Sequence, residues 1–302
     1  MTKISVILTT YNGEKTVEKT IQSIISQEGN GIDHSIELIV IDDCSTDNTY
    51  SLIRQYNCIV LKNEVNSGGP NKGRNKGLSI ATGDFICIAD QDDIWKKDKI
   101  KTMLPYLNLA PIITSGYEVV NVKTNQTISR TQSSTKDYML YRKNETFLKR
   151  LTKSSDGQNT YMGSMIYSSQ LKDILFEEHF GMVDFDWLLR LFHQQTSIEV
   201  CKPLYERILD DTNLSLNETY RKYDFYYSLL TLEGYDKLYP KETALAYKKI
   251  HGSRARYYYL TGNMQKARFY FARSQWNIKT LFYVITSFVG SQFVKKHFNV
   301  FG

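Results

Sequence analysis

The sequence is poor in the features that mark membrane-spanning, secreted and disulfide-bonded chains. Its 302 residues include four cysteines, five prolines and five histidines. The cysteines lack the spacing of a metal site, and the histidines show no metal-ligand pairing. No apolar run reaches the ~18–20 residues that cross a bilayer. We expect no secretory signal, because residues 4–8 are too short for its apolar core. These absences favour reduced, mostly buried cysteines in a cytoplasmic protein.

Charge and tyrosine are unevenly distributed along the chain. The formal net charge is +6, yet residues 241–302 hold eleven Lys and Arg and a single acid, Glu242. Residues 1–240 therefore carry a net charge of −4, and twelve of the 22 tyrosines lie at or after position 220. This split argues against a basic protein that coats nucleic acid along its whole length. It suggests an acidic front part that could hold a cation and a basic, aromatic back part.

Four short apolar segments in the first hundred residues predict the strands of a parallel sheet. They are residues 4–8, 37–41, 58–61 and 85–89. Each is apolar almost throughout, and helical patterns separate them, which is typical of an α/β sheet covered on both faces. Ligands of such sheets lie beyond the carboxyl ends of the strands. We therefore expect three polar segments to be neighbours in space: residues 9–13, 42–47 and 90–93.

The remainder of the chain gives weaker signals. Residues 218–302 look entirely helical, with Gly252 and Gly262 as punctuation between two helices. A helix is expected to open at Asp186, and residues 123–145 are expected to form a loop or flap. Further strands are expected at residues 112–115, 118–122 and 161–167.

The strongest chemical signal is Asp90-Gln91-Asp92-Asp93, directly after a predicted buried strand. Three carboxylates within four residues repel one another unless a cation holds them. Oxygen ligands of this kind suit Mg²⁺ or Mn²⁺, with phosphate oxygens completing the coordination shell. The alternative is a solvated acidic turn that caps a helix near Trp95.

Two further motifs are polar segments at strand or helix ends. Asp42-Asp43 ends the second strand, where one carboxylate can accept a hydrogen bond from a base or a ribose hydroxyl. Its alternative role is to cap the following helix. Small residues at 66–69 precede a basic helix with Lys72 and Arg74, which could lie against phosphates. This segment has neither the Walker-A nor the G-x-G-x-x-G order, so it is weak by itself.

Together these motifs resemble the family 2 glycosyltransferases with the GT-A fold. The resemblance covers residues 4–100 and rests on five segments: S-V-I-L-T-T-Y-N at 5–12, E-L-I-V-I-D-D-C-S-T-D-N-T at 37–49, R-N-K-G-L at 74–78, A-T-G-D-F-I at 81–86 and D-Q-D-D at 90–93. It implies a Rossmann-like, mostly parallel sheet with helices on both faces. We place this catalytic domain at residues 1–217 and a basic, Tyr-rich helical domain at residues 218–302.

The resemblance also implies an activity. This is metal-dependent, inverting transfer of a single sugar from a UDP- or dTDP-linked donor to a glycan or lipid-linked acceptor, in surface polysaccharide or glycoconjugate synthesis. Single transfer is expected because the Q-x-x-R-W element of processive synthases is absent. One alternative is a sugar nucleotidyltransferase, which would want a Gly-rich, basic loop after the first strand. Another is a catalytically dead GT-A domain with a helical interaction module.

The resemblance assigns the donor residues by position. Thr9, Tyr11 and Asp42 look like the nucleobase site, and Arg74 and Asp90 lie where the family contacts the nucleotide-sugar.

The same comparison implies a metal site at Asp90-x-Asp92 for Mn²⁺ or Mg²⁺, with Asp92 preferred as the direct ligand. Asp210 stands where family members often have a histidine that helps to bind the metal, and it is a third candidate ligand. Asp93 and Trp95 are candidates for acceptor contact. The Trp95 ring could stack on a sugar or equally pack in the core.

The family also uses a carboxylate base near the acceptor, in a motif that opens a helix ending in arginine. The segment V-D-F-D-W-L-L-R at 183–190 fits that spacing, with Val183 in place of the usual glutamate. Asp184 is therefore our candidate for the catalytic base and Asp186 the fallback. An inverting transfer needs such a base to deprotonate the acceptor hydroxyl as it attacks. The alternative for both residues is helix capping.

The basic end of the chain has two interpretations. Its helices could pack on the catalytic domain or on a second subunit in a homo-oligomer. They could instead dock on an anionic membrane surface, with residues 281–293 as the apolar part. The second interpretation would make the protein peripheral at the inner face of the membrane. Nucleic acid is not expected as a partner.

Overall fold

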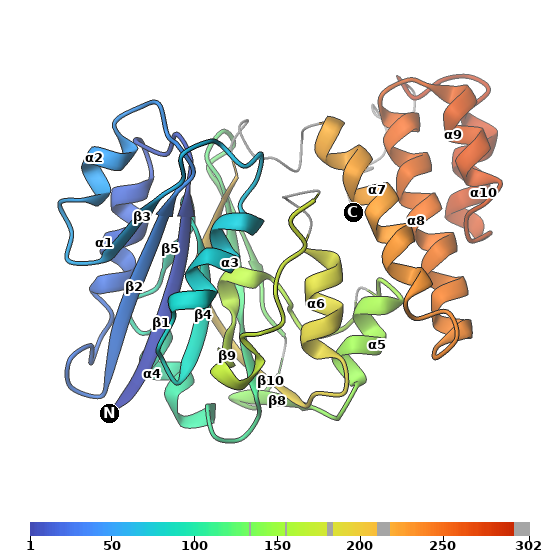
Figure 1. Ribbon diagram of the computed structural model, residues 1–302. Coiled ribbons are helices and arrows are strands. Elements are labelled where there is room, and N and C mark those ends of the chain that lie inside the picture. The colour runs from blue at the N-terminus through green and yellow to red at the C-terminus, as the bar shows by residue number, and fades with distance from the viewer. Residues whose placement is uncertain (133, 155, 180–183, 210–217, 293–302) are drawn as a thin grey trace. The chain divides into compact units, whose positions relative to one another are not determined.

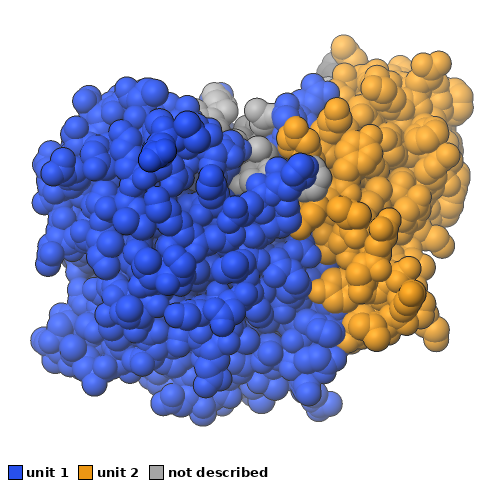
Figure 2. Space-filling model, in the orientation of Figure 1, with its two compact units in different colours: residues 1–147, 156–220 blue, residues 148–155, 221–302 orange. Residues whose placement is uncertain are grey.

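The computed structural model describes residues 1–132, 134–154, 156–179, 184–209 and 218–292. The chain forms two compact units, which are distinguished in Figure 2. We call residues 1–147 and 156–220 the sheet unit and residues 148–155 and 221–302 the helical unit. The helical unit thus includes a short segment from the middle of the chain.

The first four strands of the sheet unit are parallel neighbours, as their apolar composition predicts. They are β1 (Thr2–Thr10), β2 (His34–Asp42), β3 (Ile59–Lys62) and β4 (Phe85–Asp90). Beyond β4 the sheet continues with β9 (Ile166–Ser168), β6 (Ile112–Asn121), β10 (Ser197–Leu209) and β5 (Ile94–Trp95), so its order is β3-β2-β1-β4-β9-β6-β10-β5. The chain therefore fills one half of the sheet before it enters the other. Figure 1 shows the helices between these strands lying against the sheet. The predicted α/β class is confirmed.

Helices cover both faces of this half. Ile4, Val6 and Leu8 of β1 pack with Val17 and Ile21 of α1 (Val17–Ile25). The other face receives α3 (Asn71–Ile80), whose glycines allow a close approach. A Cβ at Gly77 would lie 2.5 Å from Cγ2 of Ile7, and one at Gly73 would lie 2.9 Å from Cγ2 of Thr9. The N-terminal half of α3 is therefore held directly beside the end of β1.

The second half of the sheet is mixed. Its strands are β5 (Ile94–Trp95), β6 (Ile112–Asn121), β7 (Gln126–Arg130), β8 (Tyr138–Tyr141), β9 (Ile166–Ser168) and β10 (Ser197–Leu209). Strands β6 and β10 are parallel, while β9 is antiparallel to both β4 and β6. The remaining elements of the sheet unit are α2 (Thr49–Ile53), α4 (Lys99–Met103), η1 (Leu104–Tyr106), α5 (Glu145–Leu151, which continues into the helical unit), η2 (Met162–Ser164), η3 (Ser169–Leu171) and α6 (Phe185–Phe192).

Three expectations about this half are wrong. Residues 123–145 are not a loop, because β7 pairs with β6 and β8 pairs with β10. Residues 161–167 contain a 3₁₀ turn before the short strand β9. Trp95 lies in a strand, so the helix expected there begins only at Lys99.

Glu37 of β2 ties the amino-terminal half of β1 to the turn before β4. Its carboxylate accepts from Lys3 Nζ at 2.6 Å, Ser5 Oγ at 2.5 Å and the backbone N–H of Thr82 at 2.9 Å. Burial would raise the pKa of Glu37, but these hydrogen bonds together lower it to about 2. The carboxylate is thus stabilised in its charged form.

The helical unit consists of α7 (Glu218–Glu233, whose first three residues belong to the sheet unit), α8 (Pro240–Leu260), α9 (Met264–Phe271) and α10 (Ile278–Thr286). Its core is formed by Ala255, Tyr259, Ala267, Phe271 and Tyr283. The expectation of an all-helical end holds over residues 218–292, although α8 runs through Gly252 instead of ending there. No helix in the described ranges is long and apolar enough to cross a membrane.

Candidate functional site

The carboxyl ends of β1, β2 and β4 bring the first predicted residues together. In the strand register Thr9 is the partner of Asp90, and Thr10 is the partner of Asp42. Asp42 is fully buried, and its carboxylate accepts from the backbone N–H of Ser45 at 3.1 Å and from the Thr10 hydroxyl at 3.5 Å. The polar segments expected to be neighbours therefore share one edge of the sheet.

Arg74 is fixed at this edge by α3. Its Nη2 donates to Oδ1 of Asp90 at 2.9 Å, and its Nη1 donates to Oδ1 of Asn71 at 3.0 Å. The guanidinium carbon also lies 5.2 Å from the centroid of the Phe176 ring. The arginine side chain is only 5% exposed, so it holds Asp90 in one orientation and balances part of the local negative charge.

Gln91 is a site residue that the sequence did not single out. Its side-chain amide accepts from the backbone N–H of Tyr11 at 2.9 Å and donates to the Tyr11 carbonyl at 3.1 Å. This pair of bonds fixes the loop after β1 and leaves the Tyr11 ring 45% exposed. Gln91 could not be recognised as a site residue from the sequence, because its contribution is to hold the backbone of Tyr11 through hydrogen bonds.

The carboxylates of the acidic motif differ in environment. Asp93 is 2% exposed, and its Oδ2 makes no hydrogen bond within the described part of the chain. Burial, followed by the negative charges of Asp90 and Asp92, raises the pKa of Asp93 well above its usual range, whereas Arg207 opposes this shift. The neutral, protonated form of Asp93 is therefore favoured, and the negative charge of this loop rests on the other carboxylates.

The oxygen donors of this loop fit a hard divalent cation in part. Asp90 and Asp92 supply carboxylate oxygens, the donor type that Mg²⁺ and Mn²⁺ prefer. Within the described ranges, no group of three or more His, Cys, Asp or Glu side chains is arranged to hold a metal. The third candidate ligand, Asp210, lies outside the described residues. Two protein carboxylates leave several coordination positions for a bound diphosphate.

The two residues predicted to contact the acceptor lie in the interior. Asp93 is buried as described above, and Trp95 in strand β5 is only 3% exposed. The ammonium group of Lys99 lies 3.5 Å from the centroid of the Trp95 ring and donates to the Gly163 carbonyl at 2.6 Å. Burial lowers the pKa of Lys99 to about 8. This environment favours the packing role for Trp95 over stacking on a sugar.

Three tyrosines from distant parts of the chain stack beneath the acidic loop. The rings of Tyr117, Tyr161 and Tyr205 lie 5.2–5.5 Å apart and nearly parallel. The guanidinium carbon of Arg207 lies 5.0 Å from the Tyr161 ring centroid. Sequence patterns cannot reveal this cluster, because Tyr117 and Tyr205 come from the paired strands β6 and β10, and Tyr161 precedes η2 in another part of the chain.

Helix α6 presents the two candidate bases in different states. Asp184 stands at the N-cap position and is half-buried. Asp186 is held by Arg190, whose Nε and Nη2 both donate to Oδ2 at 2.8 and 2.7 Å. Arg190 also donates to the Leu175 carbonyl at 2.8 Å, so the Asp186–Arg190 pair anchors the helix to the preceding segment.

That segment also reaches the donor side. Phe176 stacks on Trp187 of α6 with ring centroids 4.3 Å apart, while its other contact is the Arg74 guanidinium. The backbone of Phe176 exchanges two hydrogen bonds with the side-chain amide of Asn75 on α3. Phe176 thus links the helix that carries Arg74 to the helix that follows Asp184.

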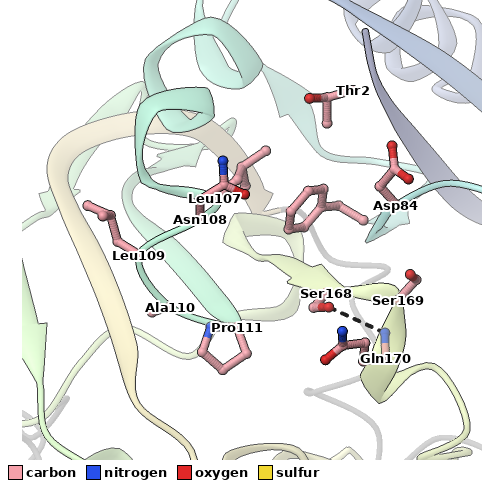
Figure 3. Close-up of a pocket in the computed structure, with 11 residues that line it drawn as sticks. Thr2, Asp84, Leu107, Asn108, Leu109, Ala110, Pro111, Ser168, Ser169 and Gln170 are labelled. Atoms are coloured by element: carbon pink, nitrogen blue, oxygen red, sulfur yellow. Dashed lines mark hydrogen bonds between the residues drawn. The ribbon is translucent and has the colours of Figure 1, made fainter.

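A separate cavity lies at the opposite edge of the sheet. It has a volume of about 650 Å³ and is bordered by the amino ends of β1 and β4, by the segment 107–111 and by residues 168–170. Figure 3 shows Thr2 and Asp84 on one side of it and Ser168 and Gln170 on the other. Because Thr2 and Asp90 lie at opposite ends of paired strands, this cavity is not part of the carboxylate edge.

The family model for "Glycosyl transferase family 2" matches residues 5–175, more than half of the chain. The chain belongs to this family.

Curated relatives of this family 2 chain are named as transferases of sugars. Poly(ribitol-phosphate) beta-N-acetylglucosaminyltransferase TarS of Staphylococcus aureus is 38% identical over 112 residues, which are 36% of this chain and 19% of TarS. The Bacillus subtilis putative teichuronic acid biosynthesis glycosyltransferase TuaG is 38% identical over 34% of this chain and 41% of its own length. The dTDP-rhamnosyl transferase RfbG of Shigella flexneri is 37% identical over 33% and 36%. The matches thus cover less than half of each relative.

Solved structures of TarS share the fold across nearly the whole chain. The S. aureus TarS 1–349 complex with UDP matches with a TM-score of 0.65 at 20% identity, covering 98% of this chain and 93% of that one. The UDP-GlcNAc complex matches with a TM-score of 0.66 at 20% identity, covering 90% and 82%. The predicted GT-A-like fold with C-terminal helices is therefore confirmed.

The family match does not extend over the whole candidate site. Residues 5–175 include every candidate on the donor and acidic segments, from Thr9 to Trp95. They end before Asp184 and Asp186, so the assignment of the base depends on the geometry of α6.

Proposed function

We propose that this chain is a metal-dependent, inverting glycosyltransferase that moves one sugar from a UDP- or dTDP-linked donor to a glycan or lipid-linked acceptor in surface polysaccharide or glycoconjugate synthesis. The observation that carries the proposal is the Arg74–Asp90 ion pair at the sheet edge that also holds Thr9 and Asp42. The names of the relatives and the UDP-bound TarS structures support the donor class. Four free cysteines support a cytoplasmic location.

The donor would lie along this edge. The exposed Tyr11 ring offers a stacking face to the base. Asp42 and Thr9 are 0% and 8% exposed, so their oxygens would reach the base only after the residues that cover them move. Arg74 would hold the Asp90 carboxylate in place beside the cation that the diphosphate binds. Asp92 would be the direct ligand of Mn²⁺ or Mg²⁺, with Asp90 beside it, since the carboxylate of Asp90 is already engaged by Arg74. When bound, the cation would neutralise charge on the leaving diphosphate.

Asp184 is the proposed base. Its carboxylate would remove the proton from the acceptor hydroxyl while that oxygen attacks C1 of the sugar from the face opposite the leaving diphosphate. Asp186 suits this role less, because Arg190 donates two hydrogen bonds to the same carboxylate oxygen. Its function is to orient the start of α6.

Calorimetric titration with UDP, dTDP and GDP, with and without Mn²⁺, tests the proposal. We expect UDP or dTDP to bind, and to bind more tightly with the metal, whereas binding of GDP alone would contradict the proposed donor class. Asp92→Asn should remove the metal dependence, since it removes the charged ligand. Asp84→Asn is the matched control at the other end of β4, and it should behave as the unchanged protein. Absence of binding by all three nucleotides, or metal dependence that survives Asp92→Asn, would contradict the proposal.

The nucleotidyltransferase alternative has less support. It would require a Gly-rich, basic loop after β1, where this chain has Thr9-Thr10-Tyr11-Asn12 instead. Membership of the glycosyltransferase family also favours sugar transfer. An assay that follows release of pyrophosphate from UTP with a sugar phosphate separates the two activities.

A further inference from the structure

Helix α10 of the helical unit exposes its apolar side. Ile278, Leu281 and Ile285 are 89%, 49% and 61% exposed, and they recur at the spacing of one helix face. Phe288 and Val289 follow the helix and are 73% and 80% exposed. Soluble proteins usually turn such a stripe toward the core. Its exposure here marks a surface that contacts another protein or a membrane.

The opposite side of α10 is buried and carries hydroxyl side chains around Tyr283, which belongs to the core of the helical unit. Thr280, Thr286 and Ser287 are each less than a tenth exposed. Their hydroxyls donate to the carbonyls of Gln275, Phe282 and Val284, so none is left without a hydrogen bond. The packing of α10 against α9 and α8 (Figure 1) buries Tyr283, with Val284 beside it, and leaves Ile278, Leu281 and Ile285 exposed.

Cationic and aromatic side chains flank this surface. The guanidinium carbon of Arg273 lies 3.7 Å from the ring centroid of Phe269, which is 52% exposed, and that of Arg268 lies 4.7 Å from the Phe288 ring. Lys279 is exposed on α10 itself. No Asp or Glu occurs after Glu242 in the sequence. The segment that carries the apolar stripe and its flanking side chains therefore contains positive charges and no negative ones.

We propose that α10, together with Phe288 and Val289, docks on an anionic phospholipid bilayer, with the apolar stripe in the interface and the flanking cations on the lipid phosphates. We call this set the α10 face: Ile278, Leu281, Phe282, Ile285, Phe288 and Val289. An apolar face with a cationic rim is the arrangement that binds at a membrane surface without crossing it. Pairing two copies through this face would bring two unbalanced positive rims together, which disfavours a second subunit as the partner.

Tryptophan fluorescence can measure this docking. Of the three tryptophans, Trp95 and Trp187 are buried in the sheet unit, at 3% and 1% exposed, and Trp276 precedes α10 with 59% exposed. A change in emission on adding vesicles therefore reports on the helical unit. We expect a blue shift and cosedimentation with vesicles of equal parts phosphatidylglycerol and phosphatidylcholine. Pure phosphatidylcholine should give neither, and ~1 M salt should weaken binding because it screens the cations.

Two variants of the full-length chain separate the apolar and charged contributions. Ile285→Glu with Phe288→Glu should reduce the partition coefficient on the mixed vesicles by about tenfold or more. Lys279→Glu should reduce it less and weaken its salt dependence. Leu238→Glu, at a 67% exposed position between α7 and α8, is the matched control and should leave binding unchanged.

Several results would overturn the proposal. These are failure of the protein to bind the anionic vesicles, equal binding to neutral vesicles, or full binding by the Ile285→Glu, Phe288→Glu variant. Concentration-dependent self-association that this variant abolishes, in the absence of vesicle binding, would assign the face to a second copy. None of these measurements uses a nucleotide or a sugar, so their outcome is independent of the proposed transferase activity.

Discussion

Exchanging each acid at the start of α6 for its amide should separate proton transfer from helix anchoring. Asp184→Asn removes the proposed base, and removal of a general base costs about 10²–10⁴ in rate, or about 3–5 kcal/mol of activation free energy. Asp186→Asn keeps an acceptor oxygen but loses the charge that binds Arg190. Both partners of that pair are partly exposed, at 18% and 36% of the side chain. We therefore expect a loss of about 0.5–1 kcal/mol in the free energy of unfolding.

Initial rates of sugar transfer and urea unfolding, measured on the same preparations, check this contrast. Asp184→Asn should be nearly inactive and as stable as the unchanged protein, because the backbone carbonyl of Asp184 still accepts from Leu188. Asp186→Asn should retain most of its activity. Arg190→Met is the matched control for the anchoring pair and should resemble Asp186→Asn. Full activity of Asp184→Asn together with an inactive but folded Asp186→Asn would refute the assignment.

Three further outcomes follow from the contacts of the sheet unit. Arg74→Lys should weaken nucleotide binding about tenfold in calorimetry, since a single ammonium cannot hold both partners of the guanidinium. Gln91→Glu should also weaken nucleotide binding, because a carboxylate cannot donate to the Tyr11 carbonyl. The melting temperature should change little. The lowered pKa of Glu37 should stabilise the fold by about 2 kcal/mol above pH ~4.5, and this gain should disappear as the pH falls toward 2. Glu37→Gln should therefore be less stable in urea at pH 6 but not at pH 2, and an equal difference at both would be contrary to this cause.

The parallel half of the sheet could be predicted because β1, β2 and β4 are largely buried on both faces, and the partly exposed edge strand β3 is still apolar in sequence. Such strands are apolar almost throughout, so each is visible in the sequence by itself, and parallel pairing then forces the polar ends to one edge. The strands that were missed have the opposite character. Every residue of β7 is exposed, and β7 exists only because β6 offers it a partner. Polar edge strands of this kind cannot be told from loops without their neighbours.

The helical end shows a different limit. Gly252 was expected to interrupt a helix, yet α8 continues through it, and a Cβ there would lie 3.4 Å from Cβ of Ser274. The glycine therefore sits where Ser274 comes close, a contact between residues 22 positions apart that local propensity does not register.

Within the site, the charged residues could be predicted from the sequence, whereas the residues that hold them in place could not. Carboxylates and Arg74 stand out by residue type and position, whereas Gln91 and Phe176 act through backbone and ring contacts across the fold. Asp186 shows the same limit. The motif ranks it second to Asp184, and the sequence does not reveal that Arg190 already engages its carboxylate.

The order of the site along the chain affects how such proteins can diversify. Every residue assigned to the donor precedes position 100, and the proposed base comes much later. In the described ranges, the strands before position 100 pair with the later strands in two short places. Strand β4 pairs with β9 through Phe85–Ser168 and Ile86–Tyr167, and β5 pairs with β10 through Ile94–Glu206 and Trp95–Tyr205. A hybrid gene that preserved these two seams and the Phe176 contacts could join the front of one family member to the back of another. Recombination could then exchange sugar preference and acceptor preference separately.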